Sequence, residues 1–107
     1  MARKKLLINC SEDAKQQLCA AIRMYAEAAY PPGGSECAQV ARETLMDAAN
    51  SIEQQYAEHA QAEISGRLRS QLKLATEFFA EMAESEGQDI ENLVTEFQSI
   101  IKGKNTG

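Results

Sequence analysis

The stretch RKKLLINCSED, residues 3–13, determines how the fold begins. Its aliphatic run, Leu6–Ile8, is too short for the apolar face of a helix but suits a short strand. Ser11 then offers a side-chain oxygen to cap a helix, and the two acids that follow it suit the positive end of the helix dipole. The sequence therefore predicts a strand or arm over residues 1–10 and a helix that begins near residue 12.

The same stretch resembles the start of a secretory signal, because three cations precede the aliphatic residues. A signal needs an apolar region of about 7–15 residues, and this one ends after three. No other run approaches the ~20 apolar residues of a membrane span. We therefore expect a cytoplasmic protein with no membrane segment.

Helical periodicity covers most of the remaining chain. A first helix over residues 12–29 ends at the Pro31–Gly34 loop, where two prolines remove donors and two glycines free the backbone. After Ser35, a second possible cap, an apolar stripe runs from Cys37 to Ile64 and continues in phase to Met82. Gly66 favours a break in this stripe, although one long kinked helix also fits the pattern.

A last helix is predicted after Asp89, with Ile90, Leu93, Val94, Phe97, Ile100 and Ile101 on one face. Residues 102–107 are predicted to be a flexible polar tail. The expected fold is mainly α, with a short N-terminal strand followed by three to four amphipathic helices. It forms a single domain over residues 1–107 and assembles as a dimer.

The net charge of −5 disfavours non-specific binding of nucleic acid, which depends on clustered cations. The charge is uneven along the chain. Residues 67–75 hold three cations and no acid, whereas residues 76–101 hold seven acids and no cation. Direct contact with nucleic acid is therefore expected only at the N-terminus, if anywhere.

The residue types needed for catalysis or metal binding are sparse, so we predict no enzyme activity, no cofactor and no metal. His59 is the only histidine, and no HExxH or GxSxG pattern is present. The three cysteines lack CxxC spacing and are interpreted as small apolar residues in a reducing compartment. The acids Glu77, Glu81 and Glu84 are interpreted as a solvent-facing stripe.

The apolar surface predicted for residues 68–82 is wider than contact with one neighbouring helix requires. Leu72 and Phe79 share one face, while Leu74 and Phe78 lie about 100° to the side. A helix buried on two sides of its own core would explain this width, and so would contact with another chain. On the second interpretation the predicted partner-binding residues are Leu74, Phe78, Phe79, Met82, Phe97 and Ile101.

The segments KKLLINC, SEDAKQQLCAAIRMYA, YPPGGS and ECAQVARETLMDAA together resemble the ribbon-helix-helix plan over about half the chain. In that family the strands of two chains pair, inward aliphatic residues close the dimer, and outward residues read DNA. The resemblance implies that Leu6 and Ile8 close the dimer, and the aliphatic segment Leu6, Leu7 and Ile8 as a whole is predicted to carry dimerisation. The outward set would include Lys5, Leu7 and Asn9, and Leu7 is poorly suited to reading base edges.

The length, acidity, helical content and wide apolar stripes are also similar to those of the QslA-like anti-activators of quorum sensing. That resemblance implies binding to a LuxR-type transcription factor and blocking of its dimerisation or its DNA contact. The preferred hypothesis is therefore a non-enzymatic bacterial regulator that binds and inhibits a partner protein. The alternatives are a ribbon-helix-helix-like DNA-binding regulator contacting DNA through Arg3, Lys4, Lys5 and Asn9, and a phage-type acidic inhibitor.

Overall fold

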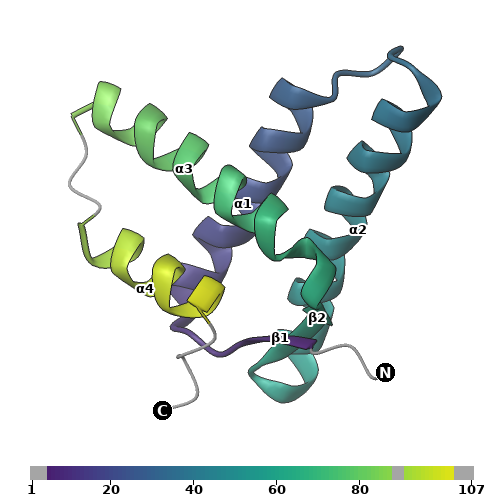
Figure 1. Ribbon diagram of the computed structural model, residues 1–107. Coiled ribbons are helices and arrows are strands. Elements are labelled where there is room, and N and C mark those ends of the chain that lie inside the picture. The colour runs from purple at the N-terminus through teal and green to yellow at the C-terminus, as the bar shows by residue number, and fades with distance from the viewer. Residues whose placement is uncertain (1–4, 88–90, 103–107) are drawn as a thin grey trace.

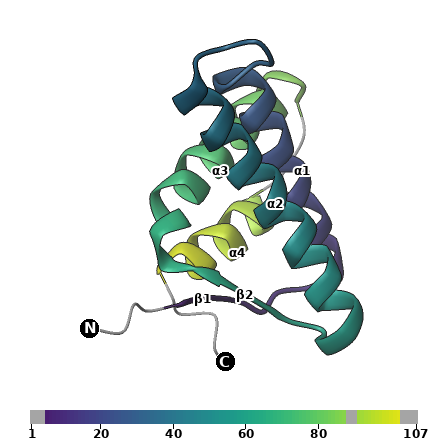
Figure 2. The same cartoon turned by 90° about the vertical axis from the view of Figure 1, so that its right-hand side faces the viewer.

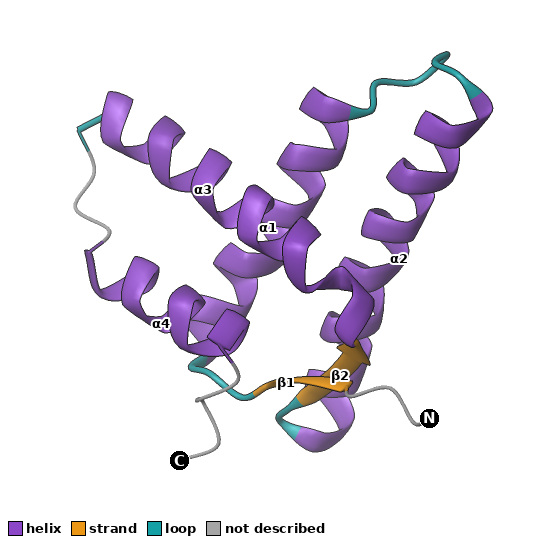
Figure 3. Ribbon diagram, in the orientation of Figure 1, coloured by secondary structure: helices purple, strands orange, loops and turns teal. Residues whose placement is uncertain are grey.

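A computed structural model describes residues 5–87 and 91–102 of the chain. It is mainly helical, as predicted, with a short N-terminal strand and four helices within this part of the chain (Figure 3). The elements in chain order are β1 (Lys5–Ile8), α1 (Glu12–Ala29), α2 (Glu36–His59), β2 (Ala62–Ser65), the 3-10 turn η1 (Gly66–Leu68), α3 (Arg69–Ser85) and α4 (Glu91–Lys102). The predicted cap Asp89, the helix residue Ile90 and the tail after residue 102 lie outside the described residues.

Helix α1 is the centre of the arrangement, because it packs against α2 and also against α3. Figure 1 shows α1 and α2 side by side, joined by the loop at their upper ends, with α3 crossing α1. The two strands lie across the lower ends of these helices (Figure 2). Helix α4 contacts α3, α1 and β1 and so lies over one side of the core.

The first two helices begin at the predicted caps. The Ser11 Oγ accepts a hydrogen bond from the Ala14 backbone N at 3.1 Å, and the Ser35 Oγ accepts one from Ala38 N at 3.2 Å. Each bond satisfies one of the backbone donors that a helix N-terminus leaves free. The predicted bounds of the first helix, residues 12–29, are confirmed.

Two arginines fasten α1 to α2. Arg23 on α1 donates to both carboxylate oxygens of Glu53 on α2, at 2.8 and 3.1 Å, and this pairing lowers the pKa of Glu53. Arg42 on α2 pairs with Glu27 and donates to the Tyr30 carbonyl at 3.2 Å. These contacts hold α1 against α2 near the middle of the two helices and near the loop that joins them.

The second predicted helix is wrong beyond His59. Ala60 adopts a left-handed conformation with φ of 60°, which ends α2, and Ala62–Ser65 form β2 instead of a further helical turn. Along β2 the side chains alternate, with Ala62 and Ile64 buried. Helical periodicity placed Ile64 in the core correctly but could not show that a strand brings it there. The prediction of two helices rather than one long kinked helix is confirmed, but the interruption begins at Ala60, before Gly66, and includes β2 and η1.

Strand β1 pairs with β2 of the same chain in antiparallel register, with Leu6 opposite Ile64 and Ile8 opposite Ala62. Leu6 and Ile8 are 1% and 0% exposed and belong to the core of their own chain. Leu7 is half-buried.

Leu6, Leu7 and Ile8 were predicted to close a dimer because β1 was expected to pair with the same strand of a second chain. The structure corrects that expectation, since β1 pairs within its own chain. A ribbon-helix-helix chain pairs its strand with a second copy, whereas here β2 is the partner of β1. Leu6 and Ile8 already bury their side chains within one chain. The homodimer itself stays a prediction.

The side chain of Gln55 on α2 completes the hydrogen bonding of β2. Its Nε2 donates to the Glu63 carbonyl at 3.0 Å, and its Oε1 accepts from the Glu63 backbone N at 2.9 Å. The amide thus takes the place that a neighbouring strand would occupy along this edge.

We expect Gln55→Ala to lower the free energy of unfolding by about 1 kcal/mol, because the two hydrogen bonds to Glu63 and the one to Ser51 are lost and water can partly replace them. Urea denaturation followed by circular dichroism measures the change. Gln54→Ala is the matched control: Gln54 is the exposed neighbouring glutamine on the same helix, and its loss should change stability by less than about 0.5 kcal/mol. Equal effects of the two variants would contradict the role assigned to Gln55.

Tyr56, the next residue on α2, holds the end of β1. Its hydroxyl accepts from the Cys10 backbone N at 2.9 Å and lies within donating distance of the Ile8 and Cys10 carbonyls, at 3.3 and 3.2 Å. The Lys15 ammonium lies 5.7 Å from the centre of the Tyr56 ring and 2.9 Å from a Glu12 oxygen. Burial raises the pKa of Tyr56, so this hydroxyl keeps its proton at neutral pH.

Candidate protein-binding surface on helix α3

Helix α3 begins at Arg69, directly after η1, and turns one face to the core. Leu72 and Ala75 are fully buried on this face, and Ala83 is nearly so. Phe79 is half-buried, and its ring meets that of Phe97 on α4 edge to face at 6.1 Å between centroids. The core face therefore joins α3 to both α1 and α4, and it leaves two flanks of the helix on either side.

The first flank carries an apolar ridge of three residues, Leu74, Phe78 and Met82, which we call the α3 ridge. They follow one another at intervals of four residues and so form one line along the helix. The exposed fractions of Leu74 and Met82 are 46% and 37%, and Phe78 between them is half-buried. The Phe78 ring packs edge to face against Tyr25 on α1, with 6.2 Å between centroids.

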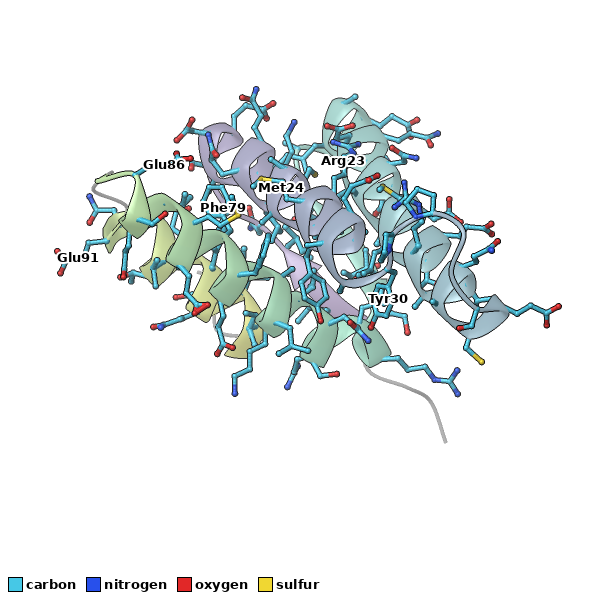
Figure 4. All side chains as sticks on the ribbon, turned by 90° about the horizontal axis from the view of Figure 1, so that it is seen from above. Arg23, Met24, Tyr30, Phe79, Glu86 and Glu91 are labelled. Carbon is cyan, nitrogen blue, oxygen red and sulfur yellow. The ribbon has the colours of Figure 1, made fainter. Side chains whose placement is uncertain are left out.

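Helix α1 borders the α3 ridge. Tyr25 and Tyr30 form a second edge-to-face pair with centroids 6.2 Å apart, so aromatic packing extends from Phe78 to the end of α1. In Figure 4, Met24 on α1 and Phe79 on α3 lie where these two helices run beside each other. The ridge is therefore the outer border of a packed α1–α3 contact rather than a set of isolated side chains.

The second flank of α3 faces α4 and contains a pocket of about 340 Å³, which we call the α3–α4 pocket. It is lined by Lys73, Thr76, Glu77, Ala80, Val94, Phe97, Gln98 and Ile101. Phe97 is 2% exposed and belongs to the core. The pocket and the α3 ridge thus lie on different sides of one helix.

The six predicted partner-binding residues are not brought together on one surface. Leu74, Phe78 and Met82 form the α3 ridge, whereas Phe97 and Ile101 line the pocket on the other flank. Phe79 lies between the two, against Phe97 in the core. A projection of one helix shows the width of its apolar surface but not which part of that surface its neighbours cover.

Three apolar residues that lie on the surface or in the pocket were not identified from the sequence as candidate site residues. Val40 on α2 is 63% exposed, and Ala80 and Val94 line the α3–α4 pocket. Val40 is not a member of the apolar stripe of residues 37–64. Its position outside that stripe is the signal that could have identified it as exposed.

The acids of α3 lie outside the core. Glu77, Glu81 and Glu84 are all exposed, and Glu77 also lines the pocket. The sequence places no lysine or arginine from residue 76 to residue 101. The C-terminal part of the α3 ridge is therefore set in an acidic surface, which attracts basic partners at moderate ionic strength.

Two of the three cysteines, Cys10 and Cys19, are poorly suited to nucleophilic chemistry, whereas Cys37 is exposed and not part of the core. Burial raises the pKa of Cys10 and raises that of Cys19 to about 11, so both thiols stay protonated at neutral pH. His59 is exposed and lies 3.6 Å from an oxygen of its neighbour Glu58. Over residues 5–87 and 91–102, no three His, Cys, Asp or Glu side chains are grouped closely enough to hold a metal ion.

Searches of protein-family models, curated proteins and solved structures found no match to this chain. In the described part of the chain, none of the helices combines the length and the apolar character that crossing a membrane requires. The functional argument therefore depends on the surfaces of the molecule itself.

Proposed function

We propose that this chain is a cytoplasmic, non-enzymatic regulator that binds a partner protein through the α3 ridge and inhibits that partner by covering one of its surfaces. The observation that carries the proposal is the exposure of Leu74 and Met82 on one line of a helix, with Phe78 between them. Single exposed apolar residues are ordinary on protein surfaces, but aligned ones are typical of binding sites.

The dimensions of the ridge suit contact with a protein. Leu74 and Met82 are eight residues apart, which corresponds to about 12 Å along a helix. An apolar strip of this length matches the spacing of anchor residues in helix-in-groove recognition. The aromatic pair of Phe78 and Tyr25 gives the middle of the strip a rigid base.

The charge around the C-terminal part of the ridge supports a basic partner surface. Glu81 lies beside the ridge, and no cation follows Lys73 until residue 102. DNA-binding faces of transcription factors are basic, so such a protein is the partner class that we propose. Covering its DNA-binding or dimerisation surface would inhibit it, which is the mode of action that we expect from the sequence for a quorum-sensing anti-activator.

The proposal predicts that Leu74→Ser/Met82→Ser weakens binding of the partner by about 100-fold, because two exposed anchors are lost while the core is kept. The partner is first captured from the native host and purified, and titration calorimetry then gives the affinity of each variant. Circular dichroism checks that the double variant keeps its helical content.

Val40→Ser is the matched control, because Val40 is the third large apolar residue that the described structure leaves exposed, and it lies on α2. Its affinity should equal that of the unmodified chain. The proposal is contradicted if the double variant binds as tightly as the control.

A further inference from the structure

The α3–α4 pocket has the size of a small-molecule site. Its volume of about 340 Å³ lies at the lower end of the range of about 300–1,000 Å³ found for ligand pockets. That volume suits a small ligand rather than a helix of a partner protein. The pocket is also separate from the α3 ridge, so the proposed function does not use it.

The pocket combines an apolar side with a charged side. Ala80, Val94, Phe97 and Ile101 provide the apolar lining, from both helices. The polar lining comes mainly from α3, where Lys73 and Glu77 are both exposed. The Thr76 hydroxyl does not donate a hydrogen bond into the pocket, because it donates to the Lys73 carbonyl at 2.9 Å.

Lys73 is the cation that lines the pocket, and a second cation lies on the same side of α3. Arg69 precedes Lys73 by four residues and therefore lies on the same side of α3. Within residues 5–87 and 91–102, the structure shows no ion pair for either side chain. Residues 67–75 hold three cations and no acid in a chain of net charge −5, so the start of α3 is locally positive.

We propose that the α3–α4 pocket binds a small apolar carboxylic acid, such as a medium-chain fatty acid. The acyl chain lies against Val94, Phe97 and Ile101, and the carboxylate lies at the Lys73 end, within reach of Arg69. Glu77 sits one turn further along α3 and repels the carboxylate, which keeps the head group at the Lys73 end.

Nitrogen-15 NMR titration with octanoate tests the proposal directly, with 1-octanol and octylammonium as neutral and cationic probes of equal chain length. Octanoate should shift the backbone amides of residues 73–80 and 94–101 in a saturable manner. Octanol and octylammonium should each bind about tenfold more weakly, because they lack the charge that Lys73 attracts. Equal binding of octanol and octanoate, or shifts confined to other residues, would overturn the proposal.

Variants separate the charge from the apolar lining. Lys73→Glu should weaken octanoate binding by about tenfold, whereas Glu77→Gln should tighten it by about threefold. Ala80→Phe should abolish binding, because the added ring fills the pocket without removing apolar surface.

Arg67→Glu is the control, since it changes the net charge as Lys73→Glu does but at a residue that does not line the pocket. It should alter the affinity by less than about twofold. An equal loss in Arg67→Glu and Lys73→Glu would show that overall charge governs the affinity and would refute the site. Binding that persists in Ala80→Phe would refute it as well.

Discussion

Ile8→Lys is expected to leave the chain largely unfolded at room temperature. The Ile8 side chain is fully buried between β2 and the helices, so the variant loses an apolar side chain and places an ammonium group in the core. The lost packing costs about 2–5 kcal/mol, and an unpaired buried charge adds several kcal/mol more. The sum is comparable to the total stability of a small domain, about 5–15 kcal/mol.

Circular dichroism and one-dimensional NMR measure the result, and Asn9→Lys provides the control. Asn9 is adjacent in the chain and exposed, so the same substitution there should keep the fold. This pair of variants also distinguishes the two roles considered for β1. A folded Ile8→Lys chain that only dissociates from dimer to monomer would show that the strand joins two chains and would contradict its place in the core.

Phe97→Ala should lower the free energy of unfolding by about 3–5 kcal/mol. Phe97 is 2% exposed, and its ring meets Phe79 on α3 edge to face, so the truncation leaves a cavity between α3 and α4. Helix α4 has only twelve residues and would not be stable alone. Its attachment therefore depends on this ring and on Ile100, which is also buried.

Urea denaturation gives the stability change for Phe97→Ala. Gln98→Ala, at the exposed neighbouring position, should change stability by less than about 0.5 kcal/mol. A loss below about 1 kcal/mol in Phe97→Ala would mean that α4 does not depend on the core contact described here.

The features that the sequence predicted well have local causes. Ser11 and Ser35 cap their helices by accepting from backbone donors three residues away. The capping residue and the helix start that it stabilises are therefore close together in the sequence. The Pro31–Gly34 loop likewise ends α1 for a local reason, because its prolines lack the backbone N–H that a helix needs. The bounds of α1 could therefore be predicted without any knowledge of the tertiary structure.

Strand β2 could not be predicted in the same way. Ile64 continues the helical phase of Tyr56, so the pattern alone favours helix. The strand is selected by pairing with β1, more than fifty residues earlier, and by the amide of Gln55. Such contacts between distant parts of the chain override local preference and leave no periodic signal.

The candidate site was predictable only in part. Side-chain projection identified Leu74, Phe78 and Met82 because they share one line on a helix. It could not separate them from Phe97, whose burial depends on how α4 packs. The α3–α4 pocket could not be predicted from the sequence either, because its lining residues come from two helices whose packing the sequence does not show.

The central claim is that the α3 ridge is the surface that binds the partner. Hydrogen–deuterium exchange of the purified complex, compared with the free chain, tests it most directly. The account predicts added protection over residues 74–82 and around Tyr25, with no change around Val40 at the start of α2. Added protection at the start of α2 or along β1, with α3 unchanged, would contradict it.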